Sequence, residues 1–216
     1  MSKILLIGGN GYIGSRLQQS LDVDVVDTNW FNDEGSGEDF KDLTSKHYDD
    51  YDTVILLAGH SSVKMSEGNL NSCFNNNVRN FIDLIEKLDG QRLIYASSSS
   101  VYGSVGGKTV NEKYYGFEPY NQYDISKHTA DLYAQKSDVE YYGLRFGTVN
   151  GCSPVLRTDV MINAMVNSAL RDGHIKLYIK DTMAGGTIVI LNRATNCPSI
   201  FIMVRNCILY AALFVI

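Results

Sequence analysis

Residues 4–14 read Ile-Leu-Leu-Ile-Gly-Gly-Asn-Gly-Tyr-Ile-Gly, an apolar run followed at once by closely spaced glycines. The uninterrupted run predicts a central strand of a parallel sheet, because such a strand is buried on both faces. In the turn that follows, Gly8 lets the chain bend sharply, Gly11 lets a phosphate approach the backbone, and Gly14 lets a helix pack closely on the strand. The helix expected over 11–21 then offers free N–H groups to that phosphate. This stretch therefore predicts a dinucleotide-binding strand, turn and helix.

The rest of the chain alternates short apolar runs with helical patterns, which is typical of repeated strand–helix–strand units. Strands are expected over 4–7, 23–26, 53–57, 92–96 and 141–146. Helices are expected over 11–21, 123–135 and 159–170, and another should bury one face formed by Phe74, Val78, Phe81, Ile82, Ile85 and Leu88. The polar stretch 29–39 is expected to be a loop, with one short edge strand near Phe40. We therefore predict an α/β fold with a doubly wound parallel sheet of the Rossmann type.

The charge of the chain excludes some classes of partner. Its formal net charge is −5, and it has no basic run interleaved with aromatic residues. Because a negative surface repels phosphate backbones and anionic lipid, we expect neither nucleic acid nor a membrane as partner. The four cysteines show no metal-ligand spacing with the histidines, so no metal is expected. The short apolar run at 4–7 does not resemble a signal peptide, which favours a cytoplasmic location.

The end of the second expected strand selects between two cofactors. That strand ends at Asp27, where a carboxylate would accept hydrogen bonds from an adenosine ribose. The same charge would repel a 2′-phosphate, and no Lys or Arg lies between Arg16 and Lys41 to neutralise one. NAD is therefore expected as the cofactor rather than NADP.

Tyr123 and Lys127 are four residues apart, which places them on one face of a helix. A lysine ammonium beside a phenol stabilises the phenolate, so the phenol can act as a base near neutral pH. Of the 14 tyrosines, Tyr123 is the only one followed by a lysine at this spacing. The run Ser97 to Ser100 follows the strand 92–96, at the edge where doubly wound sheets bind ligands. A hydroxyl there could bind a reacting oxygen, or the run could simply be a polar junction between strand and loop.

Together these motifs resemble the NAD-dependent epimerase/dehydratase family, the extended short-chain dehydrogenases that include UDP-galactose 4-epimerase-like proteins. The resemblance covers roughly residues 1–170. The motifs that carry it, in family order, are Gly8-x-x-Gly11-x-x-Gly14, Asp42-Leu43, Leu57-Ala58-Gly59, Asn76-Asn77-Val78, Ser98 to Gly103, Pro119-x-Asn121-x-Tyr123-x-x-Ser126-Lys127, and Leu144 to Val149.

The resemblance implies roles for individual residues. The implied catalytic residues are Ser98, Tyr123 and Lys127. The implied NAD-binding residues are Gly8, Gly11, Tyr12, Ile13, Gly14, Asp27, Asp42, Leu43, Leu57, Ala58, Gly59, Asn76 (or its neighbour Asn77), Tyr123 and Lys127. The implied substrate contacts are Ser98, Ser99 and Arg157, and His60, Ser61 and Ser62 could edge the sugar pocket. A homodimer is common among similar proteins and is expected only on that ground.

The implied substrate is a nucleotide sugar, and the favoured reaction is epimerisation through transient oxidation of a sugar hydroxyl, with Tyr123 as the base. Dehydratases of this family usually place an Asp-Glu pair after the catalytic Ser or Thr. Here Ser99 and Ser100 occupy those positions, which disfavours dehydration. Two alternatives stay open: a nucleotide-sugar reductase or dehydrogenase with the same three residues, and a truncated NAD-binding protein with little or no turnover.

The C-terminal part of the sequence departs from the family pattern. We expect an NAD-binding domain over 1–150 and a partial or atypical substrate-binding region over 151–216. Leu177 and Tyr178 begin a plausible strand of that region, whereas no family motif follows Met183. The segment 199–216 is strongly apolar, yet its Arg and Asn would be costly in lipid, so a buried element or an aberrant end is favoured over an anchor. A truncated or frameshifted end would leave the substrate lid incomplete.

Overall fold

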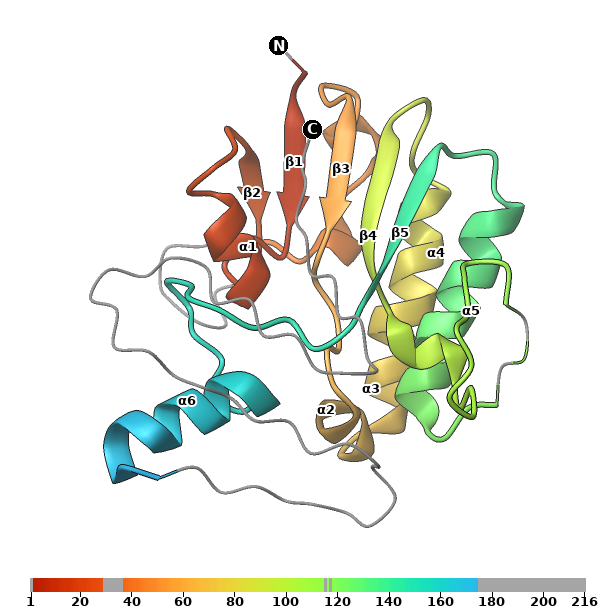
Figure 1. The fold of residues 1–216 in the computed structure, drawn as a ribbon. Helices are drawn as coiled ribbons and strands as arrows, with labels where there is room; N and C mark the ends of the chain where they lie inside the picture. Colours follow the sequence, from red (N-terminus) through yellow and green to blue (C-terminus); the bar gives the residue numbers. More distant parts are fainter. Residues whose placement is uncertain (1, 29–36, 115, 117, 175–216) are drawn as a thin grey trace. The chain divides into compact units, whose positions relative to one another are not determined.

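The computed structural model describes residues 2–28, 37–114, 116 and 118–174, and it divides the chain into two compact units, Met1–Phe146 and Gly147–Ile216. The described part of the first unit contains a parallel sheet in the order β2-β1-β3-β4-β5 (Figure 1). Its strands are β1 (Ile4–Ile7), β2 (Asp24–Val26), β3 (Thr53–Leu56), β4 (Arg92–Ser98) and β5 (Tyr141–Phe146). The predicted α/β fold with a parallel sheet is confirmed.

The direction of winding reverses between β1 and β3. The chain passes from β1 to β2 on one side and then returns to pair β3 with the other side of β1. In doubly wound sheets the crevice at the carboxyl ends of the strands beside such a switch point binds the ligand. Gly8 and Ala58 lie there, and the backbone N–H groups of Leu57 and Ala58 both donate to the carbonyl oxygen of Ile7, at 2.8 and 3.2 Å.

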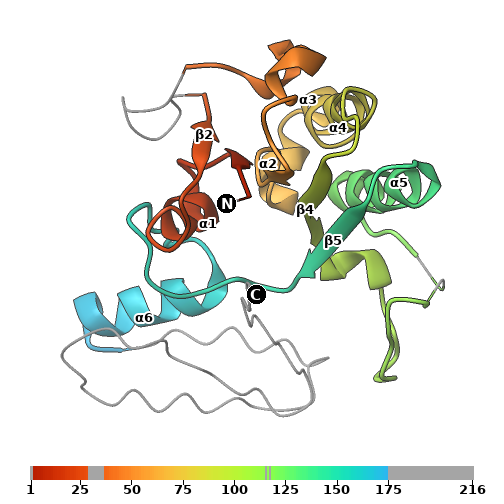
Figure 2. The same cartoon turned by 90° about the horizontal axis from the view of Figure 1, so that it is seen from above.

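Helices cover both faces of the sheet (Figure 2). Helix α1 (Tyr12–Leu17) lies on one face, and α4 (Asn80–Ile85) and α5 (Gln122–Lys136) lie on the other. Alternate strand residues enter the two layers. The core beneath α4 and α5 includes Leu5, Ile7, Val54, Leu56, Phe81, Leu84, Leu93, Tyr95, Ala130 and Ala134. The smaller core beneath α1 contains Leu6, Leu17 and Ile55.

The helical segment after β3 is interrupted by a π-helical turn. It consists of α2 (Val63–Glu67), α3 (Leu70–Phe74), the π-helical turn (Asn75–Arg79) and α4. A π turn contains an extra residue, so the side chains before it are rotated relative to those after it. The prediction that Phe74 shares a buried face with Val78 was therefore wrong. Phe74 is 46% exposed, and Cys73 is buried in its place.

The segment before β3 forms two short 3-10 turns, Phe40–Asp42 and Ser45–His47. The side chain of Asp39 accepts a hydrogen bond from the backbone N–H of Lys41 at 3.2 Å. Such a local bond favours a turn over a strand. The prediction of an edge strand near Phe40 was therefore wrong.

Of the second unit, the structure describes residues 147–174. Helix α6 (Met161–Asp172) ends at Gly173, which adopts a left-handed φ of 72°. The helix begins two residues later than predicted, and Asp159 pairs instead with Arg157 at 2.7 Å. The predicted strand at Leu177 and the apolar segment 199–216 lie outside the described residues. No helix in the described ranges is both long and apolar enough to span a bilayer.

Candidate active site

The glycine turn between β1 and α1 leaves little room for side chains. Gly8 adopts a φ of +86°, and a Cβ atom there would collide with the backbone of Ala58. A Cβ atom on Gly14 would collide with the carbonyl oxygen of Gly8, so α1, which starts at Tyr12, packs directly on the turn. At Gly11 the nearest neighbour of a Cβ atom would be that same oxygen at 3.4 Å, an ordinary contact. Protein packing therefore does not require a glycine at position 11, which fits a ligand approaching there.

A pocket opens at the switch point of the sheet. Its lining residues are Ile7, Val26, Asp27, Thr28, Glu38, Asp39, Phe40, Ala58, Gly59 and Asn76. The Asp27 carboxylate accepts a hydrogen bond from the backbone N–H of Asn10 at 2.7 Å, which holds it against the glycine turn. Partial burial raises the pKa of Asp27, although this hydrogen bond opposes the rise. Four predicted NAD-binding residues thus meet in one pocket.

The lining of this pocket, called the switch pocket below, is acidic. Asp27, Glu38 and Asp39 belong to it, whereas the described residues that line it include no Lys or Arg. Lys41 lies close in sequence, but its ammonium is paired with Asp39 at 2.7 Å and with Asp42 at 3.3 Å. A 2′-phosphate would therefore meet several carboxylates, and this charge favours NAD over NADP.

Some predicted NAD-binding residues lie outside the lining of the switch pocket. Leu43 is 4% exposed and belongs to the core beneath α4 and α5, and Asp42 pairs with Lys41. Ile13 and Leu57 pack against the core beneath α1. Their contact with a cofactor stays a prediction.

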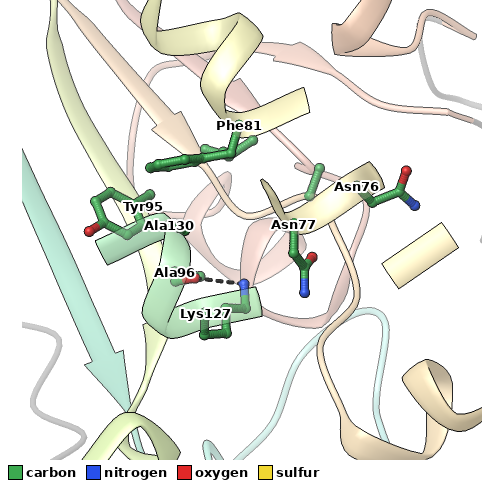
Figure 3. A pocket seen from close by; sticks show the side chains of 9 residues that line it. Asn76, Asn77, Phe81, Tyr95, Ala96, Lys127 and Ala130 are labelled. Atoms are coloured by element: carbon green, nitrogen blue, oxygen red, sulfur yellow. Dashed lines mark hydrogen bonds between the residues drawn. The ribbon is translucent and has the colours of Figure 1, made fainter. Parts of the chain in front are cut away.

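Helix α5 carries Tyr123 and Lys127 one turn apart. The Lys127 ammonium donates a hydrogen bond to the carbonyl oxygen of Ala96 at 2.8 Å (Figure 3) and lies 5.9 Å from the centre of the Tyr123 ring. Burial lowers the pKa of Lys127 to about 8, while the negative charge of Asp131 opposes this shift. The structure therefore places a lysine with a lowered pKa close to the ring of Tyr123.

A second pocket, called the lysine pocket below, lies beside Lys127 (Figure 3). Its lining residues are Leu56, Ala58, Asn76, Asn77, Phe81, Tyr95, Ala96, Lys127 and Ala130. It shares Ala58 and Asn76 with the switch pocket. The two pockets are therefore adjacent at Ala58 and Asn76.

The serine run starts inside β4, which is two residues longer than predicted because Ser97 and Ser98 pair with β5. Ser98 is buried, and its Oγ lies 2.8 Å from the Oγ of Ser100 and accepts the Ser100 backbone N–H at 3.2 Å. A short 3-10 turn (Ser99–Tyr102) follows, in which Ser99 is exposed. Ser98 thus stands at the carboxyl end of β4, two residues beyond the Lys127 partner Ala96.

The sequence motifs did not identify a buried carboxylate close to Lys127. Asp131 accepts hydrogen bonds from the Tyr95 hydroxyl and from Nε of Arg145, both at 2.9 Å. The Arg145 guanidinium in turn lies 4.9 Å from the centre of the Tyr102 ring. Asp131 follows Lys127 by four residues on α5, so the spacing of the two charges could have indicated it.

His60 lies near the lysine pocket and is half-buried, with its Nδ1 at 3.4 Å from the side-chain nitrogen of Asn76. Burial lowers the pKa of His60, and the charge of Lys127 lowers it further, which favours a neutral imidazole. Ser62 caps α2 by accepting the backbone N–H of Met65 at 3.3 Å. The predicted contacts of His60, Ser61 and Ser62 with a sugar stay predictions.

The residues at the switch point fit a dinucleotide. Asn10 is 8% exposed, yet among the described residues its side-chain nitrogen has no hydrogen-bond partner. A buried donor without an acceptor is costly in free energy, and a ligand oxygen at the glycine turn would satisfy it. Together with the glycine turn and the carboxylate of Asp27, this donor forms a site that matches a pyrophosphate and a ribose.

Arg157, a predicted substrate contact, belongs to the second unit. Its guanidinium binds Asp159 at two positions, with Nη2 at 2.7 Å and Nε at 3.0 Å from the carboxylate. Its carbonyl oxygen accepts a hydrogen bond from Asn163 at 2.8 Å. Contact between Arg157 and a substrate stays a prediction.

Comparison with known families explains why these features occur together. Residues 4–186 match the model of the NAD dependent epimerase/dehydratase family. The chain belongs to this family. The match spans the glycine turn, both pockets and the Ser98, Tyr123 and Lys127 positions, so the family resemblance inferred from the motifs is confirmed.

This epimerase/dehydratase family protein has curated relatives that are longer than itself. Protein CapI of Staphylococcus aureus is 28% identical over 209 residues, which cover 82% of this chain and 62% of CapI. The N-acetyl-alpha-D-glucosaminyl-diphospho-ditrans,octacis-undecaprenol 4-epimerase of Escherichia coli O157:H7 is 26% identical, covering 91% of this chain and 58% of the relative. The chain therefore spans about three fifths of the length of these relatives.

A solved relative shares both fold and sequence with the family protein. The UDP-glucuronic acid 4-epimerase from Bacillus cereus, in complex with UDP-glucuronic acid and NAD, superposes with a TM-score of 0.65 and is 27% identical. The alignment covers 79% of this chain and 63% of that one.

Proposed function

We propose that this protein is an NAD-dependent nucleotide-sugar epimerase that inverts a sugar carbon by transient oxidation of its hydroxyl group. The observation that carries the proposal is the Lys127 ammonium, held at 2.8 Å from the Ala96 carbonyl oxygen and next to the Tyr123 ring. Two of the relatives above are themselves 4-epimerases, which supports this reaction on the shared scaffold.

The switch pocket would hold the cofactor. Gly8, Gly11 and Gly14 keep side chains away from the pyrophosphate, and Asp27 would accept hydrogen bonds from the adenosine ribose. Ala58 and Asn76 line both pockets, and the Lys127 ammonium would bind the nicotinamide ribose. When bound, NAD supplies the group that takes a hydride from the sugar carbon and gives it back.

Tyr123 is the base in this proposal. As a phenolate it takes the proton of the sugar hydroxyl onto its Oη, and the neighbouring Lys127 ammonium stabilises the phenolate. The Ser98 hydroxyl donates a hydrogen bond to the same sugar oxygen, and the Ser100 hydroxyl at 2.8 Å helps to orient it. After the hydride returns to the opposite face, Tyr123 returns the proton, so the carbon is inverted and no net oxidation occurs.

Position 100 supports epimerisation over dehydration. The Ser100 Oγ lies 2.8 Å from the Ser98 Oγ, so this position is adjacent to the proposed site. Dehydratases resembling this chain carry an acid there, which protonates the leaving hydroxyl. A serine hydroxyl is too weak an acid for this step.

The test is to incubate the full chain with NAD and a panel of UDP-, dTDP- and GDP-sugars and to follow products by NMR. We expect one sugar to convert to its epimer while the amount of NAD stays constant. Conversion that consumes NAD in proportion to product would indicate a dehydrogenase instead. Bound NAD with no product from any sugar would contradict the proposed activity.

A further inference from the structure

We propose that Asn77 is a positioning residue that holds the loop after β3 in a fixed place relative to the catalytic helix α5. The proposal rests on the proposed function. Asn77 is 5% exposed and lies on the π-helical turn, beside Lys127 in the lining of the lysine pocket (Figure 3). Both polar atoms of its side chain bond to the protein, Oδ1 to the loop after β3 and Nδ2 to that loop and to α5.

The hydrogen bonds that join the loop after β3 to α5 through Asn77 are called the link below. Its first half holds the loop. The Asn77 Oδ1 accepts the backbone N–H of His60 at 2.8 Å, and its Nδ2 donates to the His60 carbonyl oxygen at 3.1 Å. One side-chain amide thus pairs with both backbone groups of one residue, as a neighbouring strand would. The preceding Gly59 has a φ of +128°, and a Cβ atom on it would lie 2.6 Å from the Asn77 Oδ1. The loop therefore runs directly against Asn77.

The second half of the link reaches helix α5. The Asn77 Nδ2 also donates to the Oγ of Ser126 at 3.0 Å, and that hydroxyl donates to the carbonyl oxygen of Tyr123 at 2.8 Å. Ser126 is fully buried and immediately precedes Lys127. A single hydroxyl group therefore connects Asn77 to the helical turn that carries Tyr123 and Lys127.

The surroundings of the link exclude water. Ser66 and Cys73 are buried next to it, with the Cys73 Sγ at 3.1 Å from the Ser66 Oγ and 3.8 Å from the Asn77 Nδ2. In such surroundings a hydrogen bond is stronger than in water, and a lost partner is not replaced by solvent. We therefore expect that removal of one hydrogen-bonding group weakens the whole link strongly.

The link has a direct consequence for the proposed reaction. Ala58 and Gly59 line the switch pocket, and Tyr123 and Lys127 carry the proposed chemistry. Turnover requires the cofactor and the base to be placed together to within a fraction of an ångström. Asn77 joins the two elements that provide these groups, although they are far apart in the sequence.

The test compares three variants of the full chain. Asn77→Ala removes both halves of the link, Ser126→Ala removes only the connection to α5, and Asn75→Ala removes an exposed asparagine of the same π-helical turn as the control. For each variant we would measure the Kd of NAD by calorimetry, kcat and KM for the sugar, and backbone hydrogen exchange without NAD.

We expect Asn77→Ala to speed exchange at the His60 amide, to weaken NAD binding about 10-fold and to lower kcat about 100-fold with little change in the KM of the sugar. Ser126→Ala should leave His60 exchange and NAD affinity close to wild type and lower kcat about 10-fold. Asn75→Ala should match the wild type throughout.

If Asn77 only stabilises the fold, Asn77→Ala should lower the melting temperature and leave kcat and the Kd of NAD unchanged. That result would overturn the proposal. If Asn77→Ala does not fold, an unchanged kcat in Ser126→Ala overturns it instead. If the wild type binds NAD but epimerises no sugar, the proposed function fails. The role of Asn77 can still be tested in that case. If the Asn77→Ala variant exchanges the His60 amide and binds NAD as the wild type does, the role is refuted. If exchange is faster and NAD binding weaker, the role is supported.

Discussion

Lys127 of helix α5 donates a hydrogen bond from its ammonium to the carbonyl oxygen of Ala96 in strand β4, at 2.8 Å. The bond joins two elements 31 residues apart and fixes the cation two residues before Ser98. The same ammonium lies 5.9 Å from the centre of the Tyr123 ring. The positions of the three proposed catalytic side chains are therefore coupled through one contact between helix and strand.

Replacing Tyr123 with phenylalanine should remove turnover and spare cofactor binding. The change deletes only the proposed base, so we expect kcat to fall at least about 100-fold while the Kd of NAD changes less than about two-fold. The NMR assay and calorimetry measure the two quantities. Tyr120→Phe, which removes an exposed hydroxyl three residues earlier, is the control and should stay fully active. Wild-type activity in Tyr123→Phe would refute the assigned base.

Asp131→Asn should move the alkaline side of the pH–activity profile to lower pH. The protonated form of Lys127 supports the phenolate, so activity should fall as the pH rises through the pKa of Lys127, about 8. The charge of Asp131 raises that pKa, and its removal should therefore lower the pKa of Lys127. The measurement is kcat/KM between about pH 6 and 9.5, on protein shown by circular dichroism to be folded.

The control for this variant is Asp138→Asn, which removes the same charge from an exposed position just after α5. The alkaline side of its pH–activity profile should coincide with that of the wild type. If the alkaline side of the Asp131→Asn profile also stays in place, the Asp131 carboxylate does not raise the pKa of Lys127, and this prediction is wrong.

Asp27→Asn should weaken NAD binding about 10-fold and reduce the discrimination against NADP, because a charge-assisted bond to the ribose and the repulsion of a 2′-phosphate are both lost. The amide still offers an oxygen to the Asn10 N–H, which the carboxylate binds at 2.7 Å. Titration with NADH and NADPH by fluorescence measures both affinities. The control, Asp22→Asn, removes an equal charge from an exposed position and should change neither affinity. If the ratio of the NADH and NADPH affinities is unchanged in Asp27→Asn, the assignment of Asp27 to the ribose site is wrong.

Gly8→Ala should destabilise the fold far more than Gly106→Ala. Both glycines have positive φ angles, +86° and +57°, but only a Cβ atom on Gly8 meets the backbone of Ala58, while one on Gly106 has no neighbour within 4 Å. We expect a loss of about 1 kcal/mol in the free energy of unfolding for Gly106→Ala and roughly 3 kcal/mol or more for Gly8→Ala. Urea unfolding of both variants checks the difference, and equal losses would show that the backbone angle alone matters.

Local features of the sequence were sufficient for much of the fold. The apolar run at 4–7 predicted β1 because a strand buried on both faces cannot carry polar side chains. The spacing of Tyr123 and Lys127 placed them on one helix face because helical geometry repeats every 3.6 residues. The position of Asp27 followed from where the second strand ends. Each of these depends only on residues close together in the chain.

The sequence by itself therefore determined the parallel sheet, the glycine turn and the helix face with the tyrosine and lysine. Only the tertiary structure decided that a π-helical turn directs Cys73 and Asn77 inward and leaves Phe74 exposed, because an extra residue in a helical turn leaves the apolar pattern unchanged. It also decided that Asp131 pairs with Tyr95 and Arg145, and that Lys127 reaches Ala96. These contacts join residues distant in the sequence, and they form only when the helices pack on the finished sheet.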